Sequence, residues 1–185
     1  MKIVALGDSI TAGFPYSVRD SWTACLAREL NCEVINQGVN GDYTAGMRSR
    51  FVQDVLRFMP SHVLIMGGGN DAAVQMRRES VQANFTAMIE MSRENGIIPV
   101  LGLPIPILLP EEEQFLAEYR EWQRSYAEDE KIFLIDFYGP VLAQLEAGQR
   151  RKIYVDWGHP SREGYALMGD IAVSFFNQLL PEKSE

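Results

Sequence analysis

The chain has 185 residues, of which 46% are hydrophobic and 23% are charged, and its formal net charge is −8. This length and composition are typical of one globular domain, so we expect a single domain over residues 1–185. The acidic balance argues against binding to the phosphate backbone of a nucleic acid. The sequence contains no run of about 18 apolar residues, so we expect no membrane span.

The N-terminus and the cysteines bear on the location of the protein. The chain begins with "MKIV" and runs directly into strand-like sequence, without the basic, apolar and small-residue leader of a signal peptide. Cys25 and Cys32 are the only cysteines; both lie in apolar contexts, and neither has the spacing of a zinc site. We therefore expect reduced, packed thiols in a cytoplasmic protein.

Five short segments rich in β-branched and apolar residues predict buried parallel strands. In chain order they are Lys2–Leu6, Glu33–Asn36, His62–Met66, Ile97–Leu101 and Ile132–Asp136. Longer stretches with helical spacing separate these segments. The alternation of strand and helix predicts an α/β protein with a flavodoxin-like, doubly wound parallel sheet and helices on both faces.

Four helical faces follow from the spacing of apolar residues. The first three are Met47, Phe51, Val55 and Phe58; Val81, Phe85, Met88, Ile89 and Ser92; and Phe115, Tyr119, Trp122 and Tyr126. The last helix has the clearest pattern, with Met168, Ile171, Ala172, Phe175, Phe176 and Leu179 on one face. Ser161 is expected to cap its N-terminus, with Glu163 in the first turn.

The segment "LPIPILLPEEEQ", residues 103–114, is expected to be the longest irregular stretch, because proline disfavours the interior of strands and helices. A loop of this length is either a surface connection or the border of a site. The sequence pattern leaves both readings open.

Polar and glycine-rich segments follow four of the five expected strands. In an open α/β sheet, ligands bind beyond the carboxyl ends of the strands, so these segments are expected to converge on one crevice. They are Gly7-Asp8-Ser9, "NQGVNGDYT" at 36–44, "GGGND" at 67–71 and "DWGHPS" at 156–161.

The chain has two histidines, which narrows the choice of a catalytic base. His62 opens the third expected strand, on the order of 20 Å from the crevice, and is expected to be structural. His159 lies at the crevice, and Asp156 precedes it by three residues. This spacing lets the carboxylate meet the imidazole, hold Nδ1–H and leave Nε2 free as a base.

Ser9 is the candidate partner of this base. A serine hydroxyl is a poor nucleophile until a base takes its proton, and the negative charge that then develops on a substrate carbonyl oxygen needs donors already in place. Candidate donors are the backbone N–H groups of Ser9 and Gly41 and the side-chain amide of Asn70. Each residue alone is as consistent with an ordinary turn, whereas all of them at one edge indicate catalysis. Asp8 is expected to tie the serine turn to backbone amides.

Four short blocks carry a resemblance to a known family. "GDSI" at 7–10, the glycine of "NGD" at 40–42, "GGND" at 68–71 and "DWGH" at 156–159 resemble the blocks of the SGNH, or GDSL-type, serine esterases and lipases. The resemblance extends over nearly the whole chain and implies a three-layer α/β/α sandwich with a five-stranded parallel sheet. It also implies roles for five residues: Ser9 as nucleophile, His159 as base, Asp156 as the residue that orients it, and Ser9, Gly41 and Asn70 as oxyanion donors.

The same resemblance implies a small-molecule carboxylic ester as substrate. The sequence has no metal cluster or phosphate loop, and serine acyl transfer needs neither, so we expect no cofactor. Short acyl or acetyl groups are favoured, because the chain has no evident long lid. A carbohydrate acetylesterase, a thioesterase and a lysophospholipase of the same family remain alternatives. We expect Trp157 and Pro104 to line the acyl or leaving-group side of the site.

Two readings from other classes remain open. Gly67–Ala72 fits the G-x-G-x-x-A pattern of a dinucleotide-binding protein, although it follows the third strand and Asp71 would place a carboxylate near the pyrophosphate. A non-catalytic flavodoxin-like module is the other reading. The G-x-S-x-G elbow of the α/β-hydrolases is disfavoured, because Thr11 stands where that motif has its second glycine.

Overall fold

The computed structural model describes residues 1–179, and it contains one sheet of five parallel strands in the order β2-β1-β3-β4-β5. The strands are β1 (Lys2–Gly7), β2 (Glu33–Gly38), β3 (His62–Met66), β4 (Ile98–Leu103) and β5 (Phe133–Asp136). All five expected strands are confirmed, with ends that differ by at most two residues. Residues 180–185 of the expected domain lie outside the described part of the chain.

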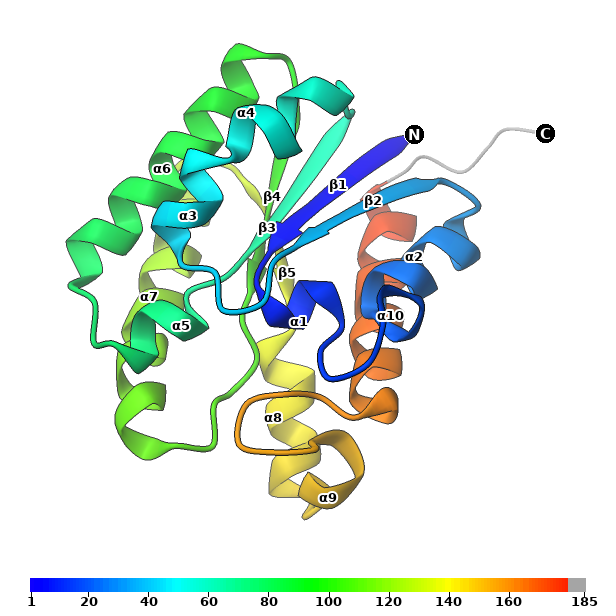
Figure 1. Ribbon diagram of the computed structural model, residues 1–185, viewed down its shortest axis with the longest axis vertical. Helices are drawn as coiled ribbons and strands as arrows, with labels where there is room; N and C mark the ends of the chain where they lie inside the picture. Colours follow the sequence, from blue (N-terminus) through cyan, green and yellow to red (C-terminus); the bar gives the residue numbers. More distant parts are fainter. Residues whose placement is uncertain (180–185) are drawn as a thin grey trace.

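Helices cover both faces of the sheet (Figure 1). One layer holds α3 (Thr44–Ser49), α4 (Phe51–Asp54), α6 (Arg78–Glu94) and α7 (Pro110–Asp129). The opposite layer holds α2 (Trp22–Leu30), α8 (Tyr138–Glu146), α9 (Arg150–Ile153) and α10 (Arg162–Leu179). The short helices α1 (Ser9–Ala12) and α5 (Gly69–Ala73) begin just beyond the carboxyl ends of β1 and β3. The expected α/β/α sandwich is therefore confirmed.

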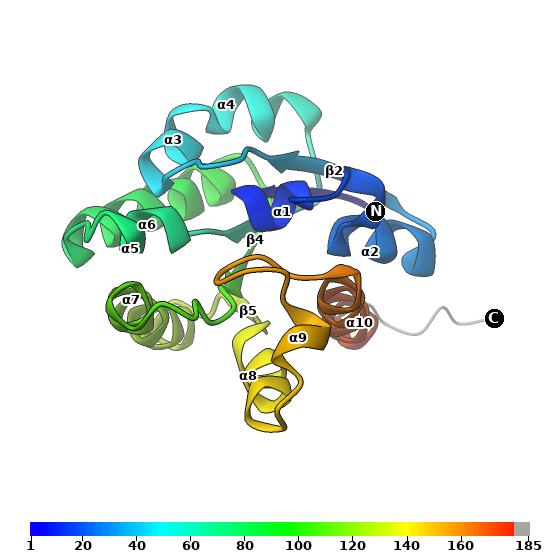
Figure 2. The same cartoon turned by 60° about the horizontal axis from the view of Figure 1, so that its bottom comes forward.

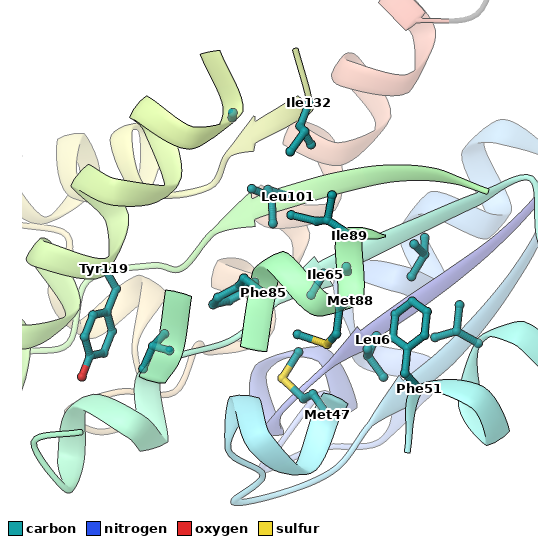
Figure 3. Packing of buried hydrophobic residues seen from close by; sticks show 14 of the residues in the cluster. Leu6, Met47, Phe51, Ile65, Phe85, Met88, Ile89, Leu101, Tyr119 and Ile132 are labelled. Atoms are coloured by element: carbon teal, nitrogen blue, oxygen red, sulfur yellow. The ribbon is translucent and has the colours of Figure 1, made fainter. Parts of the chain in front are cut away.

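The core is divided into two clusters by the sheet. Successive side chains of a strand point to opposite faces, so Val4 and Leu6 of β1 pack in one cluster and Ile3 and Ala5 pack in the other. Figure 3 shows the first cluster, in which strand residues meet side chains from the covering helices. Its labelled members are Leu6, Met47, Phe51, Ile65, Phe85, Met88, Ile89, Leu101, Tyr119 and Ile132. Burying one large apolar side chain contributes roughly 1.5–3 kcal/mol to folding.

The stretch from Met47 to Phe58 is not one helix, in contrast to the single helical face expected there. The chain leaves helical geometry at Arg50 (φ −95°, ψ 4°), and a 3-10 turn at Leu56–Phe58 follows α4. Gly46 weakens helix propensity, and the Ser49 hydroxyl donates to the Gly46 carbonyl at 2.8 Å. Met47, Phe51 and Val55 are nevertheless fully buried, because each short segment turns its apolar side toward the sheet.

The irregular stretch expected at 103–114 is shorter in the structure. Leu103 still belongs to β4, and α7 already begins at Pro110, which leaves 104–109 as the loop. Pro110 occupies the first helical turn, where the missing N–H breaks no hydrogen bond. Three glutamates in that turn interact favourably with the positive end of the helix dipole. The irregular stretch was therefore predicted too long, because Pro110 stands at the start of the helix and not in its interior.

Two further expectations concern α10 and the membrane. Ser161 caps α10, since its hydroxyl oxygen accepts the N–H of Gly164 at 3.1 Å, and Glu163 lies in the first turn. Within residues 1–179, every helix is too short or too polar to cross a bilayer.

Candidate active site

The turn that carries Ser9 is tightly packed at the end of β1. A Cβ atom on Gly7 would lie 2.6 Å from the carbonyl oxygen of Met66 on the neighbouring strand, so only glycine fits there. Asp8 follows, and its Oδ1 accepts the N–H of Ile10 at 2.9 Å, which caps α1 as expected. Ser9 is thereby fixed as the first residue of α1, with its side chain at the carboxyl edge of the sheet.

A chain of hydrogen bonds joins Ser9 to the segment before α10. The Ser9 Oγ lies 3.2 Å from His159 Nε2, and His159 Nδ1 lies 2.8 Å from Asp156 Oδ2. Asp156 Oδ1 also accepts the backbone N–H groups of Gly158 at 2.8 Å and His159 at 2.7 Å. Figure 2 shows α1 and the loop before α10 facing each other at this edge. The fold thus brings together side chains that are 150 residues apart in sequence.

The pKa values of two carboxyl groups at the site are shifted in opposite directions. Burial alone would raise the pKa of Asp156, but the hydrogen bonds from Gly158 and His159 outweigh burial and lower it. An ionised Asp156 holds the proton on His159 Nδ1, so that Nε2 presents a lone pair to Ser9. Burial raises the pKa of Asp8 to about 6, although the N–H of Ile10 and the charge of His159 act in the opposite direction.

Two aromatic rings lie beside the imidazole of His159. The Phe14 ring meets it edge-on, with centroids 4.7 Å apart, and the Trp157 ring lies at 6.0 Å. The backbone of Phe14 is itself fixed, because its carbonyl accepts the hydroxyl of Tyr165 at 2.7 Å. Phe14 was not predicted from the sequence, because it lies five residues after Ser9 in a stretch without a recognisable pattern.

Asn70 and the loop of Gly41 are in contact. The Asn70 side-chain amide donates to the carbonyl of Asp42 at 2.9 Å, and Asp42 directly follows Gly41. Gly41 has a φ of +75° within a turn that the Asp42 N–H closes onto the Val39 carbonyl at 3.1 Å. A side chain rarely adopts this conformation, so glycine suits the position.

A cavity of about 70 Å³ lies between Ser9, His159 and Asn70. Its other walls are mostly apolar and include both Pro104 and Trp157. The remaining lining residues are Asp8, Ile10, Met66, Gly67, Gly69, Ala73, Pro104, Ile105, Ile107, Trp157 and Gly158. Gly41 is not among the lining residues. The loop 104–109 thus borders the cavity, and its position is fixed by two backbone amides. The N–H of Ile107 donates to Glu113 at 2.8 Å, and the N–H of Leu108 donates to the Trp157 carbonyl at 2.7 Å.

Asp71 is a further residue whose role the sequence analysis missed. It is almost fully buried, and its two oxygens accept the Thr44 N–H at 3.0 Å and the Thr44 hydroxyl at 2.7 Å. Burial raises its pKa, and the Thr44 bonds partly offset that effect. The segment that fits a dinucleotide motif therefore binds the start of α3 through a carboxylate, and this geometry disfavours a phosphate there.

His62 opens β3 at the amino end of the sheet, as expected. Its ring packs edge-on against Phe176 with centroids 5.9 Å apart, and its Nδ1 lies 2.9 Å from the Ser61 hydroxyl. Burial lowers its pKa, so the neutral form is favoured.

Within the described residues, no group of three or more His, Cys, Asp or Glu side chains could hold a metal ion.

Comparison with known proteins identifies the fold and the family. A solved structure of a lipolytic protein of the G-D-S-L family from Desulfitobacterium hafniense DCB-2 superimposes with a TM-score of 0.82. It is 34% identical, and the match covers 94% of this chain and 98% of that one. The sheet and its two helical layers are thus those of the SGNH hydrolase fold. Residues 5–167 match the GDSL-like Lipase/Acylhydrolase family, and the chain belongs to that family.

Two curated relatives extend the comparison. The uncharacterized lipoprotein YqeF of Bacillus subtilis is 34% identical over 136 residues, which are 66% of this chain and 56% of YqeF. Esterase TesA of Pseudomonas aeruginosa is 27% identical over 155 residues, which are 78% of this chain and 76% of TesA. The chain therefore spans little more than half the length of YqeF and about three quarters of TesA.

Proposed function

We propose that this protein hydrolyses carboxylic esters of short acyl groups through a covalent acyl-enzyme intermediate on Ser9. The observation that carries the proposal is the hydrogen-bonded series Ser9 Oγ, His159 Nε2, His159 Nδ1 and Asp156 Oδ2 beside an apolar cavity. Membership of a family of lipases and acylhydrolases supports it.

In the first half of the reaction, Ser9 Oγ attacks the ester carbonyl carbon, and its proton passes to His159 Nε2. The imidazolium that forms is stabilised by the Asp156 carboxylate, 2.8 Å away. When the tetrahedral intermediate collapses, the carbon–oxygen bond to the leaving group breaks, and His159 returns its proton to the departing alkoxide. In the second half, a water molecule attacks the acyl-Ser9 ester while His159 takes its proton. The bond between the acyl carbon and Ser9 Oγ then breaks, His159 returns the proton to Oγ, and the carboxylic acid is released.

The negative charge on the carbonyl oxygen needs donors that are fixed beforehand. The N–H of Ser9 belongs to the first turn of α1, where amides have no acceptor within the helix. The Asn70 amide carries two hydrogens, and the Asp42 carbonyl takes one of them, which leaves the other for substrate. The N–H of Gly41 is the third proposed donor, on the loop that Asn70 contacts.

The size of the cavity supports a short acyl group. Its volume is about 70 Å³, whereas a single water occupies at least roughly 10–15 Å³ on a comparable measure. A chain of about two to four carbons fits this space by the same comparison, with Pro104, Ile107 and Trp157 against its methylene groups. Acetylated carbohydrates fit these limits, and a thioesterase or lysophospholipase activity requires the longer chains or larger leaving groups to extend past Trp157.

The cytoplasmic location expected from the sequence remains a prediction. Cys25 and Cys32 are both free thiols, in agreement with a reducing compartment, whereas the relative YqeF bears the name of a lipoprotein.

The test uses p-nitrophenyl acetate, butyrate and octanoate, together with a fluorophosphonate that labels activated serines. We expect the acetate and butyrate esters to give the highest kcat/KM and one phosphonyl group to be attached at Ser9, as located by mass spectrometry. The variants Ser9→Ala and His159→Ala should lose hydrolysis and labelling while circular dichroism shows that they remain folded.

The controls are Ser125→Ala, on the exposed side of α7, and His62→Ala, at the far end of the sheet. Both should retain turnover. If Ser9→Ala keeps near-normal turnover, the mechanism is wrong; if the folded wild-type protein neither hydrolyses the esters nor reacts with the probe, the non-catalytic reading is favoured.

A further inference from the structure

Arg50 makes four hydrogen bonds from a largely buried guanidinium group. Its Nη2 donates to the Gly7 carbonyl at 2.9 Å, and its Nη1 donates to the Gln37 carbonyl at 3.0 Å. Its Nε donates to Asp42 at 2.7 Å, and Nη1 also donates to Asp54 at 2.8 Å. The Arg50 side chain is 17% exposed, so these contacts are shielded from solvent.

Two of these acceptors, Gly7 and Asp42, lie next to the proposed oxyanion donors. Gly7 is the last residue of β1, two residues before Ser9, and its carbonyl also accepts the Val39 N–H at 3.1 Å from the loop that holds Gly41. Asp42 follows Gly41, and its carbonyl accepts the Asn70 amide. The Arg50 guanidinium therefore contacts the main chain just before Ser9. It also contacts Asp42, the residue that follows Gly41 and accepts the hydrogen bond from Asn70.

We propose that Arg50 is a positioning residue for the oxyanion site. Its hydrogen bonds hold the donors of Ser9, Gly41 and Asn70 at fixed separations. This inference rests on the proposed ester hydrolysis. Arg50 does not line the cavity and would not touch the substrate. It would act through the Gly7 carbonyl and through Asp42, whose carboxylate and carbonyl face Arg50 and Asn70 respectively.

The electrostatics of this region also favour a guanidinium. Asp8, Asp42 and Asp71 are close enough that Asp42 and Asp71 both raise the pKa of Asp8. Such carboxylates would oppose a developing oxyanion, and the Arg50 charge paired with Asp42 offsets part of that field. A lysine keeps the charge, but its single ammonium cannot bond in the three directions that the planar guanidinium reaches.

The experiment compares Arg50→Gln and Arg50→Lys with wild-type protein and with Arg48→Gln as a matched control. Arg48 lies two residues earlier, in α3, is exposed and, within the described residues, makes only a 3.5 Å contact to Asn84. A donor displaced by about 1 Å costs up to roughly 10²-fold in rate. We therefore expect Arg50→Gln to lose about 10²-fold in kcat with little change in KM, Arg50→Lys to fall between it and wild type, and Arg48→Gln to match wild type.

A second measurement separates positioning from a contribution to stability alone. The phosphonyl oxygen of the probe would accept hydrogen bonds from the same donors. The rate of inactivation by the fluorophosphonate should therefore fall in parallel with kcat/KM. The proposal is overturned if folded Arg50→Gln and Arg50→Lys retain wild-type kcat and inactivation rate while their unfolding free energies fall. Should Arg50→Gln not fold, Arg50→Lys decides between the same two outcomes. Absence of turnover and labelling in the wild-type protein would instead overturn the proposed function, and this inference with it.

Discussion

Asn70 has one amide hydrogen to spare, because the Asp42 carbonyl takes only the other. The ester oxygen is neutral in the bound substrate and charged in the tetrahedral intermediate, so a fixed donor stabilises the transition state more than the ground state. We expect Asn70→Ala to lose roughly 10²–10³ in kcat with little change in KM. Asn70→Asp should be worse, because a carboxylate repels the oxyanion. Steady-state kinetics of both variants, with circular dichroism as a check of folding, tests this.

The Asn70 assignment fails if Asn70→Ala keeps the wild-type kcat or loses only affinity for substrate. The loss of the bond to Asp42 is part of the effect in either variant. Asn70→Asp lacks the same bond, so the difference between the two variants reports the charge facing the substrate.

Asp8 gives the folded protein a distinctive dependence on pH. Its pKa is raised from 3.8 to about 6 by burial, with Ile10 and His159 opposing and Asp71 and Asp42 reinforcing the shift. Between these two values the folded state binds more protons at this site than the unfolded chain does, so this group's contribution to stability falls as pH rises from about 4 to 6. The Asp8→Asn variant lacks this term.

Urea unfolding of wild type and Asp8→Asn at several pH values between 4 and 7.5 measures the effect. The variant should gain on wild type by about 3 kcal/mol across the window, from roughly two pKa units at 1.4 kcal/mol each. If the difference in unfolding free energy between the two proteins does not vary with pH, the pKa of Asp8 is not raised in the folded state.

Residue types and spacing were sufficient to predict the Ser9, His159 and Asp156 contacts, because a serine, a histidine and an acid at one sheet edge have few other arrangements. Arg50, Asp71 and Phe14 could not be predicted in the same way. Their partners lie far away in the sequence or are main-chain carbonyls, and no pattern in the sequence marks a carbonyl as an acceptor.

At the scale of elements, α2 and α10 approach each other closely because of one glycine. A Cβ atom on Gly169 would lie 2.5 Å from the Cβ and 2.7 Å from the Sγ of Cys25. We expect Gly169→Ala to lower the unfolding free energy by about 1–3 kcal/mol through overpacking. In the double variant with Cys25→Gly, the clash is removed, so the combined loss should be smaller than the sum of the single losses.

Chemical denaturation of the four proteins in this double-mutant cycle gives the coupling. Strict additivity would mean that the loss in Gly169→Ala does not arise from the contact with Cys25, contrary to the prediction. A glycine inside a helix costs about 1 kcal/mol on its own, and the Cys25→Gly single variant measures that contribution.

The elements show where sequence patterns are informative. The periodicity of α6 and α10 predicted their positions because the packing of a long apolar face outweighs local preferences. The break at Arg50 was missed because Met47, Phe51 and Val55 reach the core from two short helices as well as they would from one. The start of α7 was missed because proline is compatible with both a loop and a first helical turn.

At the scale of the whole molecule, the strand order places the proposed donors. Ser9 follows β1, and β1 lies between β2, which precedes Gly41, and β3, which precedes Asn70. Gly7 is in register with Gly38 on one side and Met66 on the other, so the three strands end at the same level. The flavodoxin-like class predicted from the alternation of strands and helices therefore carried most of the information about the site. The separations between donors depended on contacts that only the folded chain contains.

The hydrogen bond from the Leu108 amide to the Trp157 carbonyl joins the wall of the cavity beside Ser9 to the segment that holds His159. Both partners are main-chain atoms, so the bond is indifferent to every side chain at position 108 except proline, which lacks the N–H. Substitutions along 104–109 can therefore change the surface proposed to meet the acyl chain without removing the bond that fixes the segment of His159. Over evolutionary time such a loop allows substrate preference to diverge under a constant chemistry.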